Sequence, residues 1–306
     1  MLQEPGHSSS LNREQLLTEV EGIIRIAERA GEKIGGFLKE EAAIIYSGMG
    51  YPGAYVLKSY MQVLRWGNAP KLMNAGEFLF SFMPYSEGKI RAIYFMGSIR
   101  ERSLALAVAE GVRVMGGEII VVTPFPNDPI IRGKIGESSL VSVEGSRDPL
   151  LSEIIASAFA GMMSAEMSGR KEDMRIVRLR NELRSLAEVY PDIIEQSCPD
   201  LKKFSDERSK IDVLFSSSLS PPANLIWYKL VSMGKDSRLL EVDASLPIAE
   251  KLWPAIVLYT SVEEGGMKEL LYRLRTMKNE GKMIRFNTDP LTAQIYASFL
   301  SRCFIQ

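Results

Sequence analysis

Apolar residues in this chain fall into short continuous runs separated by amphipathic segments, a pattern typical of buried strands that alternate with helices. Residues 92–123 and 255–288 show it twice, at nearly matching lengths. Each copy begins with an apolar run, passes a small-residue turn ending at Ser98 or Ser261, enters an amphipathic segment, and breaks at glycine before a second apolar run. A crossover of this length predicts parallel strands joined by a right-handed helix. The repeat therefore predicts two similar α/β units.

The first half is predicted to open with a long helix over residues 11–39 and a buried strand over 42–46. Residues 78–83 are predicted to be the second strand, and 140–143 the fifth, before an apolar helix over 150–167. The loop GMGYPG after the first strand matches the GxGxxG fingerprint. The second predicted strand, however, has no acid at its tip to hold a ribose, so a tight turn is favoured over a dinucleotide site. Backbone N–H groups at the start of the next helix would still accept a phosphate or sugar oxygen.

A charged segment over residues 168–210 separates the two halves. It is predicted to be a helical connector, with helices at 174–189 and 193–204 and with Pro191 and Pro199 as breaks. A second strand–loop–helix unit starts at 211–215, followed by a strand at 239–242 and a last helix at 291–304.

We therefore expect an α/β fold of two doubly wound halves, each with a mainly parallel five-stranded sheet. The expected parts are an N-terminal tail and helix (1–41), a first domain (42–167), the connector (168–210) and a second domain (211–306). Ligands of such sheets bind outside the carboxyl ends of the strands, where both small-residue loops lie.

The composition argues against several classes of function. The 306 residues are 46% hydrophobic and 25% charged, as in ordinary globular proteins, and the net charge of −1 gives no electrostatic reason for a nucleic-acid partner. No apolar run approaches the roughly 18 residues that span a membrane. The polar residues 1–10 lack the order of a signal peptide and are expected to be frayed. Cys198 and Cys303 give no disulfide framework and suit a reducing cytoplasm. With His7 as the single histidine, neither a metal nor a cofactor is expected.

The chain resembles the double sugar-isomerase (SIS) domain family, and within it the archaeal bifunctional phosphoglucose/phosphomannose isomerases. The resemblance rests on the long opening helix, the SGMG loop at residues 47–50, the connector, the length, and Arg147 in the run Ser-Arg-Asp-Pro-Leu before a helix. It implies a homodimer that binds a phosphorylated hexose and converts glucose 6-phosphate and mannose 6-phosphate into fructose 6-phosphate. Candidate substrate-binding residues are Gly48, Met49, Gly50, Gly97, Ser98, Arg100, Ser216, Ser217 and Ser218.

The chain departs from the family at the positions that carry chemistry. Where the family has a Ser-Tyr-Ser-Gly-Asn-Thr phosphate loop, residues 94–99 read YFMGSI, with Arg100 and Arg102 close behind. The position of the proton-transferring glutamate holds Met233, and the histidine for ring opening is missing. Aldose–ketose isomerisation needs a positioned base. Glu241 and Glu250, together with Arg147, are the remaining catalytic candidates.

Two classes of function follow. One is a phosphosugar-binding protein with impaired isomerase chemistry, acting as a sensor or beside an active paralogue. The other is a scaffold or interaction protein with a vestigial cleft, which predicts that apolar side chains such as Met96, Ile99 and Met233 close the pocket.

Overall fold

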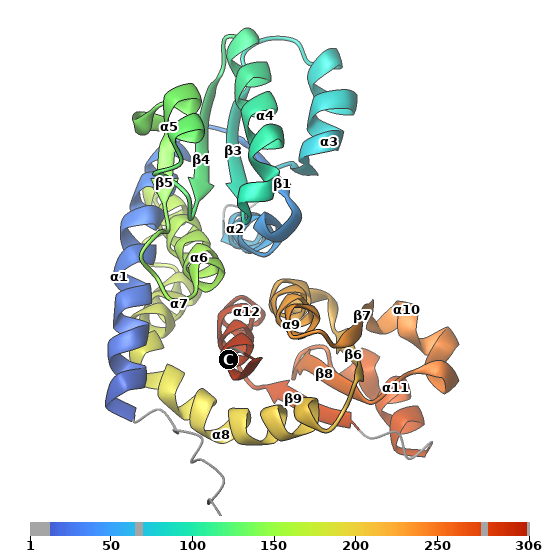
Figure 1. Cartoon of the computed structure of the whole chain (residues 1–306). Helices are drawn as coiled ribbons and strands as arrows, with labels where there is room; N and C mark the ends of the chain where they lie inside the picture. Colours follow the sequence, from blue (N-terminus) through green and yellow to red (C-terminus); the bar gives the residue numbers. More distant parts are fainter. Residues whose placement is uncertain (1–12, 65–69, 277–280, 305–306) are drawn as a thin grey trace, which may run out of the picture.

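A computed structural model describes residues 13–64, 70–276 and 281–304. The predicted frayed N-terminus, with His7, lies outside these residues. Within them the chain forms two parallel sheets, each with helices on both faces (Figure 1). This arrangement confirms the predicted α/β class of two doubly wound halves.

The first sheet has five parallel strands in the order β2-β1-β3-β4-β5. Its strands are β1 (Ala43–Ser47), β2 (Leu72–Asn74), β3 (Arg91–Met96), β4 (Glu118–Thr123) and β5 (Leu140–Ser142). Neighbouring strand residues face opposite sides, because side chains alternate along a strand. Ile44 and Ile93 pack on one face of the sheet, while Ile45 and Tyr94 pack on the other.

Two layers of helices cover this sheet. The face of Ile44 is covered by α1 (Arg13–Phe37), α2 (Tyr51–Leu64) and α6 (Pro149–Met167). The opposite face carries α3 (Ala75–Glu77), α4 (Arg102–Val114) and α5 (Pro129–Ile135). Helix α6 is apolar and long enough to cross a membrane by composition, but 78% of its apolar window is buried inside the fold. Its burial is that of a core helix.

The second sheet is parallel as well, in the order β7-β6-β8-β9. Its strands are β6 (Lys210–Phe215), β7 (Asp236–Glu241), β8 (Ala255–Thr260) and β9 (Gly281–Phe286). One face packs against α8 (Leu186–Asp206), α9 (Ser220–Ser232) and α12 (Pro290–Phe299), and the other against α10 (Val242–Ser245) and α11 (Glu264–Thr276). In the described residues this sheet has four strands rather than the five expected.

Two elements differ from the sequence-based expectation. Residues 78–83 are not a strand: β2 ends at Asn74, whose side chain accepts a hydrogen bond from the backbone N–H of Glu77 at 2.8 Å and so starts a helical segment. The connector consists of α7 (Met174–Arg184) and α8, and α8 continues through Pro191 and Pro199. Buried side chains on both sides of the prolines, such as Tyr190 and Phe204, hold α8 in place.

Helix α12 belongs to both cores. Its residues Leu291, Ile295 and Phe299 pack in the core cluster that contains α1 and α6, while Ala293 and Ala297 pack against the second sheet. Figure 1 shows α12 between the two sheets. The last helix is thus shared by the two halves. The domain boundaries proposed at 167/168 and 210/211 stay a prediction.

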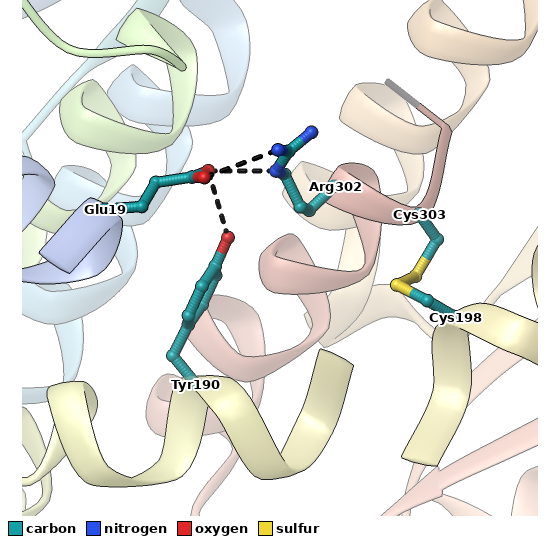
Figure 2. Close-up of a disulfide and its surroundings, with 5 residues drawn as sticks. All are labelled: Glu19, Tyr190, Cys198, Arg302 and Cys303. Carbon is teal, nitrogen blue, oxygen red and sulfur yellow. Dashed lines mark hydrogen bonds and ion pairs between the residues drawn. A yellow bond between two sulfur atoms is a disulfide. The ribbon is translucent and has the colours of Figure 1, made fainter. Parts of the chain in front are cut away.

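The two cysteines form a disulfide, contrary to the sequence-based expectation. Cys198 in α8 and Cys303 in η8 (Leu300–Phe304) are bonded, with their Cα atoms 4.7 Å apart across a sequence separation of 105 residues (Figure 2). Folding brings η8 onto α8, which no spacing rule on the sequence reveals. The expected cytoplasmic location, which relied partly on unpaired cysteines, stays a prediction.

Candidate functional site

Two loops meet at the carboxyl edge of the first sheet. The loop after β1 forms the short helix η1 (Gly48–Gly50), and the loop after β3 leads through residues 97–98 into η4 (Ile99–Glu101). Their backbones touch: a Cβ added at Gly50 would lie 2.2 Å from the carbonyl oxygen of Phe95, and one at Gly97 would lie 2.5 Å from the carbonyl carbon of Met49. Only glycine allows this approach.

The Glu101 carboxylate occupies the space between these loops. The Ser47 hydroxyl donates to Oε2 at 2.8 Å, and the backbone N–H groups of Gly97 and Ser98 donate to the same oxygen at 3.1 and 3.3 Å. The N–H of Met49 donates to Oε1 at 3.4 Å. Donors from both loops thus converge on one anion, as they would on a bound phosphate.

Burial raises the pKa of Glu101, and the hydrogen bonds from Ser47, Met49, Ser98 and Gly97 offset this only in part. A second acid, Glu153 of α6, interacts electrostatically with Glu101. It is 1% exposed, and neither carboxyl oxygen has a hydrogen-bond partner among the described residues. Burial together with the charge of Glu101 raises its pKa well above the usual value.

The second half repeats this arrangement with different residues. The Ser216 hydroxyl donates to Oε2 of Glu263 at 2.6 Å, and the Ser218 N–H donates to Oε1 at 3.0 Å. The hydroxyls of Ser218 and Thr260 donate to Oε2 at 2.6 and 2.7 Å. Burial alone would raise the pKa of Glu263, but these hydrogen bonds outweigh it and lower the pKa.

The correspondence between the halves is close. In each, a serine hydroxyl and the N–H two residues later bind the two oxygens of one glutamate: Ser47 and Met49 for Glu101, and Ser216 and Ser218 for Glu263. The loops of both halves are therefore built to hold an anion, and in both the chain supplies that anion itself.

Tyrosines of α2 link the two sets of loops. Tyr51 Oη lies 2.9 Å from Ser220 Oγ, and Tyr55 Oη donates to the carbonyl oxygen of Ser217 at 3.4 Å. Tyr46 packs edge-on against Tyr51, with ring centroids 5.1 Å apart. Burial raises the pKa of Tyr51 to about 12, so it remains a neutral hydrogen-bonding group at physiological pH.

The three catalytic candidates do not share one constellation. Arg147 is 73% exposed and pairs with Glu19 of α1 at 3.6 Å; both line a groove of about 610 Å³ between α1 and the β5–α6 loop. Glu241 is exposed at the end of β7 and accepts a hydrogen bond from Ser217 at 2.5 Å, whereas Glu250 is exposed in η7 (Leu246–Lys251). None of the residues that line the groove belongs to the loops after β1 and β3.

Of the substrate-binding candidates, Gly48, Met49, Gly50, Gly97 and Ser98 lie together around Glu101. Ser216 and Ser218 surround Glu263 instead, while Ser217 turns to Glu241. Arg100 is exposed in η4.

The three apolar residues expected to close a pocket lie in different surroundings. Met96 is fully buried in the core beneath α4, and Met233 packs against the core of the second half. Ile99 is 38% exposed. Trp227 of α9 donates to the carbonyl oxygen of Ser237 at 3.0 Å and so ties α9 to β7.

Sequence reasoning missed Glu101 and Glu263, although a signal was present. Both end a Ser/Thr-x-x-Glu run, Ser98 to Glu101 and Thr260 to Glu263, the signature of a capping box at a helix start. The structure shows the capping box at Ser98. What the signature could not predict is that both carboxylates also reach the loop after the neighbouring strand.

A scan against protein-family models gives no match, and no curated protein matches by sequence. Solved structures do match. A candidate phosphosugar isomerase from Silicibacter pomeroyi DSS-3 aligns with a TM-score of 0.70 at 13% identity, covering 95% of this chain and 96% of that one. The C-terminal domain of glucosamine-fructose-6-phosphate aminotransferase from Francisella tularensis aligns with a TM-score of 0.69 at 11% identity, over 98% and 97%. Tagatose-6-phosphate ketose/aldose isomerase from Escherichia coli gives 0.62 at 13%, over 98% and 94%.

The chain therefore has the fold of the double SIS-domain phosphosugar isomerases over nearly its whole length. At these identities the likeness defines the fold alone. A specific tie to the archaeal phosphoglucose/phosphomannose isomerases stays a prediction.

Proposed function

We propose that this protein binds a phosphorylated sugar at the loops after β1 and β3 and has little or no isomerase activity. The observation that carries the proposal is the convergence of the Ser47 hydroxyl and three backbone N–H groups on one carboxylate. Such a set of donors binds phosphate oxygens in the same way. The shared fold of proteins named for phosphosugars supports the ligand class.

The weakness of catalysis follows from the placement of acids and bases. Moving a proton between two sugar carbons needs a base within hydrogen-bond reach of both. Glu101 and Glu263 accept hydrogen bonds from their loops, and Glu241 and Glu250 are exposed. Glu153 is buried and has no hydrogen-bond partner in the part of the chain that the structure describes. Loss of a positioned acid or base costs about 10²–10⁴-fold in rate.

Calorimetry with glucose 6-phosphate and mannose 6-phosphate tests binding, and a coupled assay for fructose 6-phosphate tests turnover. We expect heat of binding and turnover far below the usual range of about 1–10³ s⁻¹. Absence of heat at millimolar ligand contradicts the binding proposal. Turnover in the usual range that is abolished by Glu241→Gln or Glu250→Gln contradicts the catalytic part.

The second candidate is a scaffold without a ligand. It is favoured by the fact that Glu101 and Glu263 already fill both anion positions. It predicts no response to either hexose phosphate.

A homodimer is proposed from the family resemblance, and sedimentation that shows only a 34.2 kDa species argues against it.

A further inference from the structure

In the first half, the loops after β1 and β3 hold the Glu101 carboxylate with donors that could equally bind an external anion. Gly48 has a φ of +41°, and a Cβ there would lie 2.2 Å from Oε1 of Glu101, so only glycine leaves room for this oxygen. The donors come from two loops that follow different strands, with Ser47 and Met49 on one and Gly97 and Ser98 on the other.

We propose that Glu101 is a built-in competitor for the ligand's phosphate, and that a phosphorylated ligand binds the first half only after the Glu101 side chain has left the loops. This inference rests on the proposed function and names the residue that sets the affinity of that site. Glu101 is a specificity-determining residue here, because it excludes anions that compete weakly for the same donors.

The contrast with the second half shows why the first half is the one that opens. Glu263 is held by three hydroxyls and one N–H, with distances of 2.6 to 3.0 Å. Glu101 is held by one hydroxyl and three N–H groups at 2.8 to 3.4 Å. The longer contacts make Glu101 the weaker occupant.

Glu153 is an independent sign that the polar groups beside the first-half loops do not all have hydrogen-bond partners in the described residues. It is 1% exposed, and within residues 13–64, 70–276 and 281–304 neither of its oxygens has a hydrogen-bond partner. Oε1 would lie 2.6 Å from a Cβ at Gly53, in the first turn of α2 just after the loop. A buried polar group without a partner is costly and uncommon. Burial and the charge of Glu101 raise the pKa of Glu153 and so favour its neutral form, which does not repel a bound phosphate.

A phosphate group would use the freed donors better than a carboxylate does. It brings three acceptor oxygens and up to two negative charges, against two oxygens and one charge. Arg100, exposed in η4 directly before Glu101, lies at the same loop and adds positive charge.

The test is calorimetric titration of the full chain with inorganic phosphate and with glucose 6-phosphate, using wild type, Glu101→Ala and Glu110→Ala. Glu110 is exposed on α4, the helix that begins directly after Glu101, so its variant loses an equal charge without opening the loops. Removing a competitor that occupies the site most of the time is expected to lower the Kd for both ligands about tenfold or more. Glu110→Ala is expected to match wild type.

Equal Kd values for Glu101→Ala and Glu110→Ala overturn the inference. If Glu101→Ala fails to fold by circular dichroism, Glu101→Gln replaces it, since it keeps the size and removes the charge, and unchanged affinity in that variant overturns the inference as well. Failure of the proposed function looks different: wild type shows no binding of glucose 6-phosphate while Glu101→Ala binds phosphate. If no variant binds either anion, both proposals are wrong.

Discussion

Glu101 and Glu263 hold equivalent positions, yet their environments shift their pKa values in opposite directions. Burial dominates at Glu101 and raises its pKa, whereas at Glu263 the hydrogen bonds from three hydroxyls outweigh burial and lower the pKa. The difference lies in the residues of the loops. Hydroxyls at Ser218 and Thr260 reach Glu263, while the corresponding first-half loops offer mainly backbone N–H groups.

These shifts predict opposite effects of pH on stability. The lowered pKa of Glu263 means that its contribution is fully present above the ordinary value of 4.5 and is lost as the pH falls through the folded-state pKa. The advantage of wild type over Glu263→Gln, about 1–3 kcal/mol for a half-buried charged hydrogen-bonding group, should therefore shrink in acid.

For Glu101 the sign is reversed. Its raised pKa means that its contribution is fully present below 4.5 and is lost as the pH rises through the folded-state pKa. The stability of Glu101→Gln relative to wild type should thus improve as the pH rises above 4.5. Denaturant unfolding at a series of pH values checks both variants. If the difference in unfolding free energy from wild type changed with pH in the same direction for both, the opposite pKa shifts would be contradicted.

Asp212 is a fully buried acid that is paired with an arginine. It is 0% exposed on β6, receives two hydrogen bonds of 2.7 Å from Arg238, and also accepts the N–H of Trp253 at 2.7 Å. Arg238→Ala leaves this carboxylate buried without its cation. The free energy of unfolding is expected to fall by about 2–4 kcal/mol, a value already reduced because Arg238 is partly exposed.

The control for Arg238→Ala is Arg132→Ala, which breaks the exposed pair with Glu137. An exposed pair is worth about 0–1 kcal/mol. Chemical denaturation of both variants measures the difference, and equal losses would show that Asp212 is not effectively buried.

At the scale of elements, glycines decide how closely the loops after β1 and β3 approach. Gly50→Ala would place a Cβ 2.2 Å from a backbone carbonyl oxygen, so the loops must separate. The expected loss is about 1–3 kcal/mol, as for overpacking. Gly22→Ala in α1, where a Cβ meets nothing within 4 Å, should instead stabilise by about 0.5–1 kcal/mol. Thermal unfolding of the Gly50→Ala and Gly22→Ala variants measures the two effects. Similar changes in Tm would argue against close contact of the loops.

The disulfide joins α8 to the last helical turn beside a buried ion pair. Arg302, next to Cys303, pairs with Glu19 of α1 at 2.8 Å, and Tyr190 of α8 donates to the same carboxylate at 3.3 Å (Figure 2). Reduction should lower the free energy of unfolding by about 2–4 kcal/mol, because the bond closes a long loop.

Unfolding with and without dithiothreitol measures this effect. A Cys198→Ser/Cys303→Ser variant serves as the control and should not respond to the reductant. Two free thiols in the unreduced, denatured protein would contradict the bond.

At the scale of the whole molecule, the two halves are expected to unfold together. Ile295 of α12 is 0% exposed and packs in the core that includes α1 and α6, and Tyr60 of α2 donates to the carbonyl oxygen of Leu291 at 3.4 Å. Ile295→Ala should cost about 2–5 kcal/mol and lower hydrogen-exchange protection of β1 and β3 as much as that of β6 and β8. Loss confined to the second sheet would mean that the halves are independent.

Local patterns were sufficient for most of the strand–helix order. The apolar runs that became β1, β3, β6 and β8 are buried on both faces, so they read as continuous apolar segments. The strand expected at residues 78–83 was wrong because a run of large apolar residues suits a helical segment equally, and the Asn74 cap decided between them. For the candidate site, the sequence identified the loops but missed the two glutamates inside them.

The sequence by itself determined the fold class and the loops, because burial periodicity, glycine turns and capping residues act over a few neighbouring positions. The tertiary structure decided which groups meet: Glu101 with Ser47, Glu263 with Ser216, Cys198 with Cys303, and α12 with the first core. Each of these contacts joins segments that are distant in sequence. Only packing brings such segments together, and the chemistry of the loops changed when it did: two anion sites that the sequence leaves open are filled by the chain's own carboxylates.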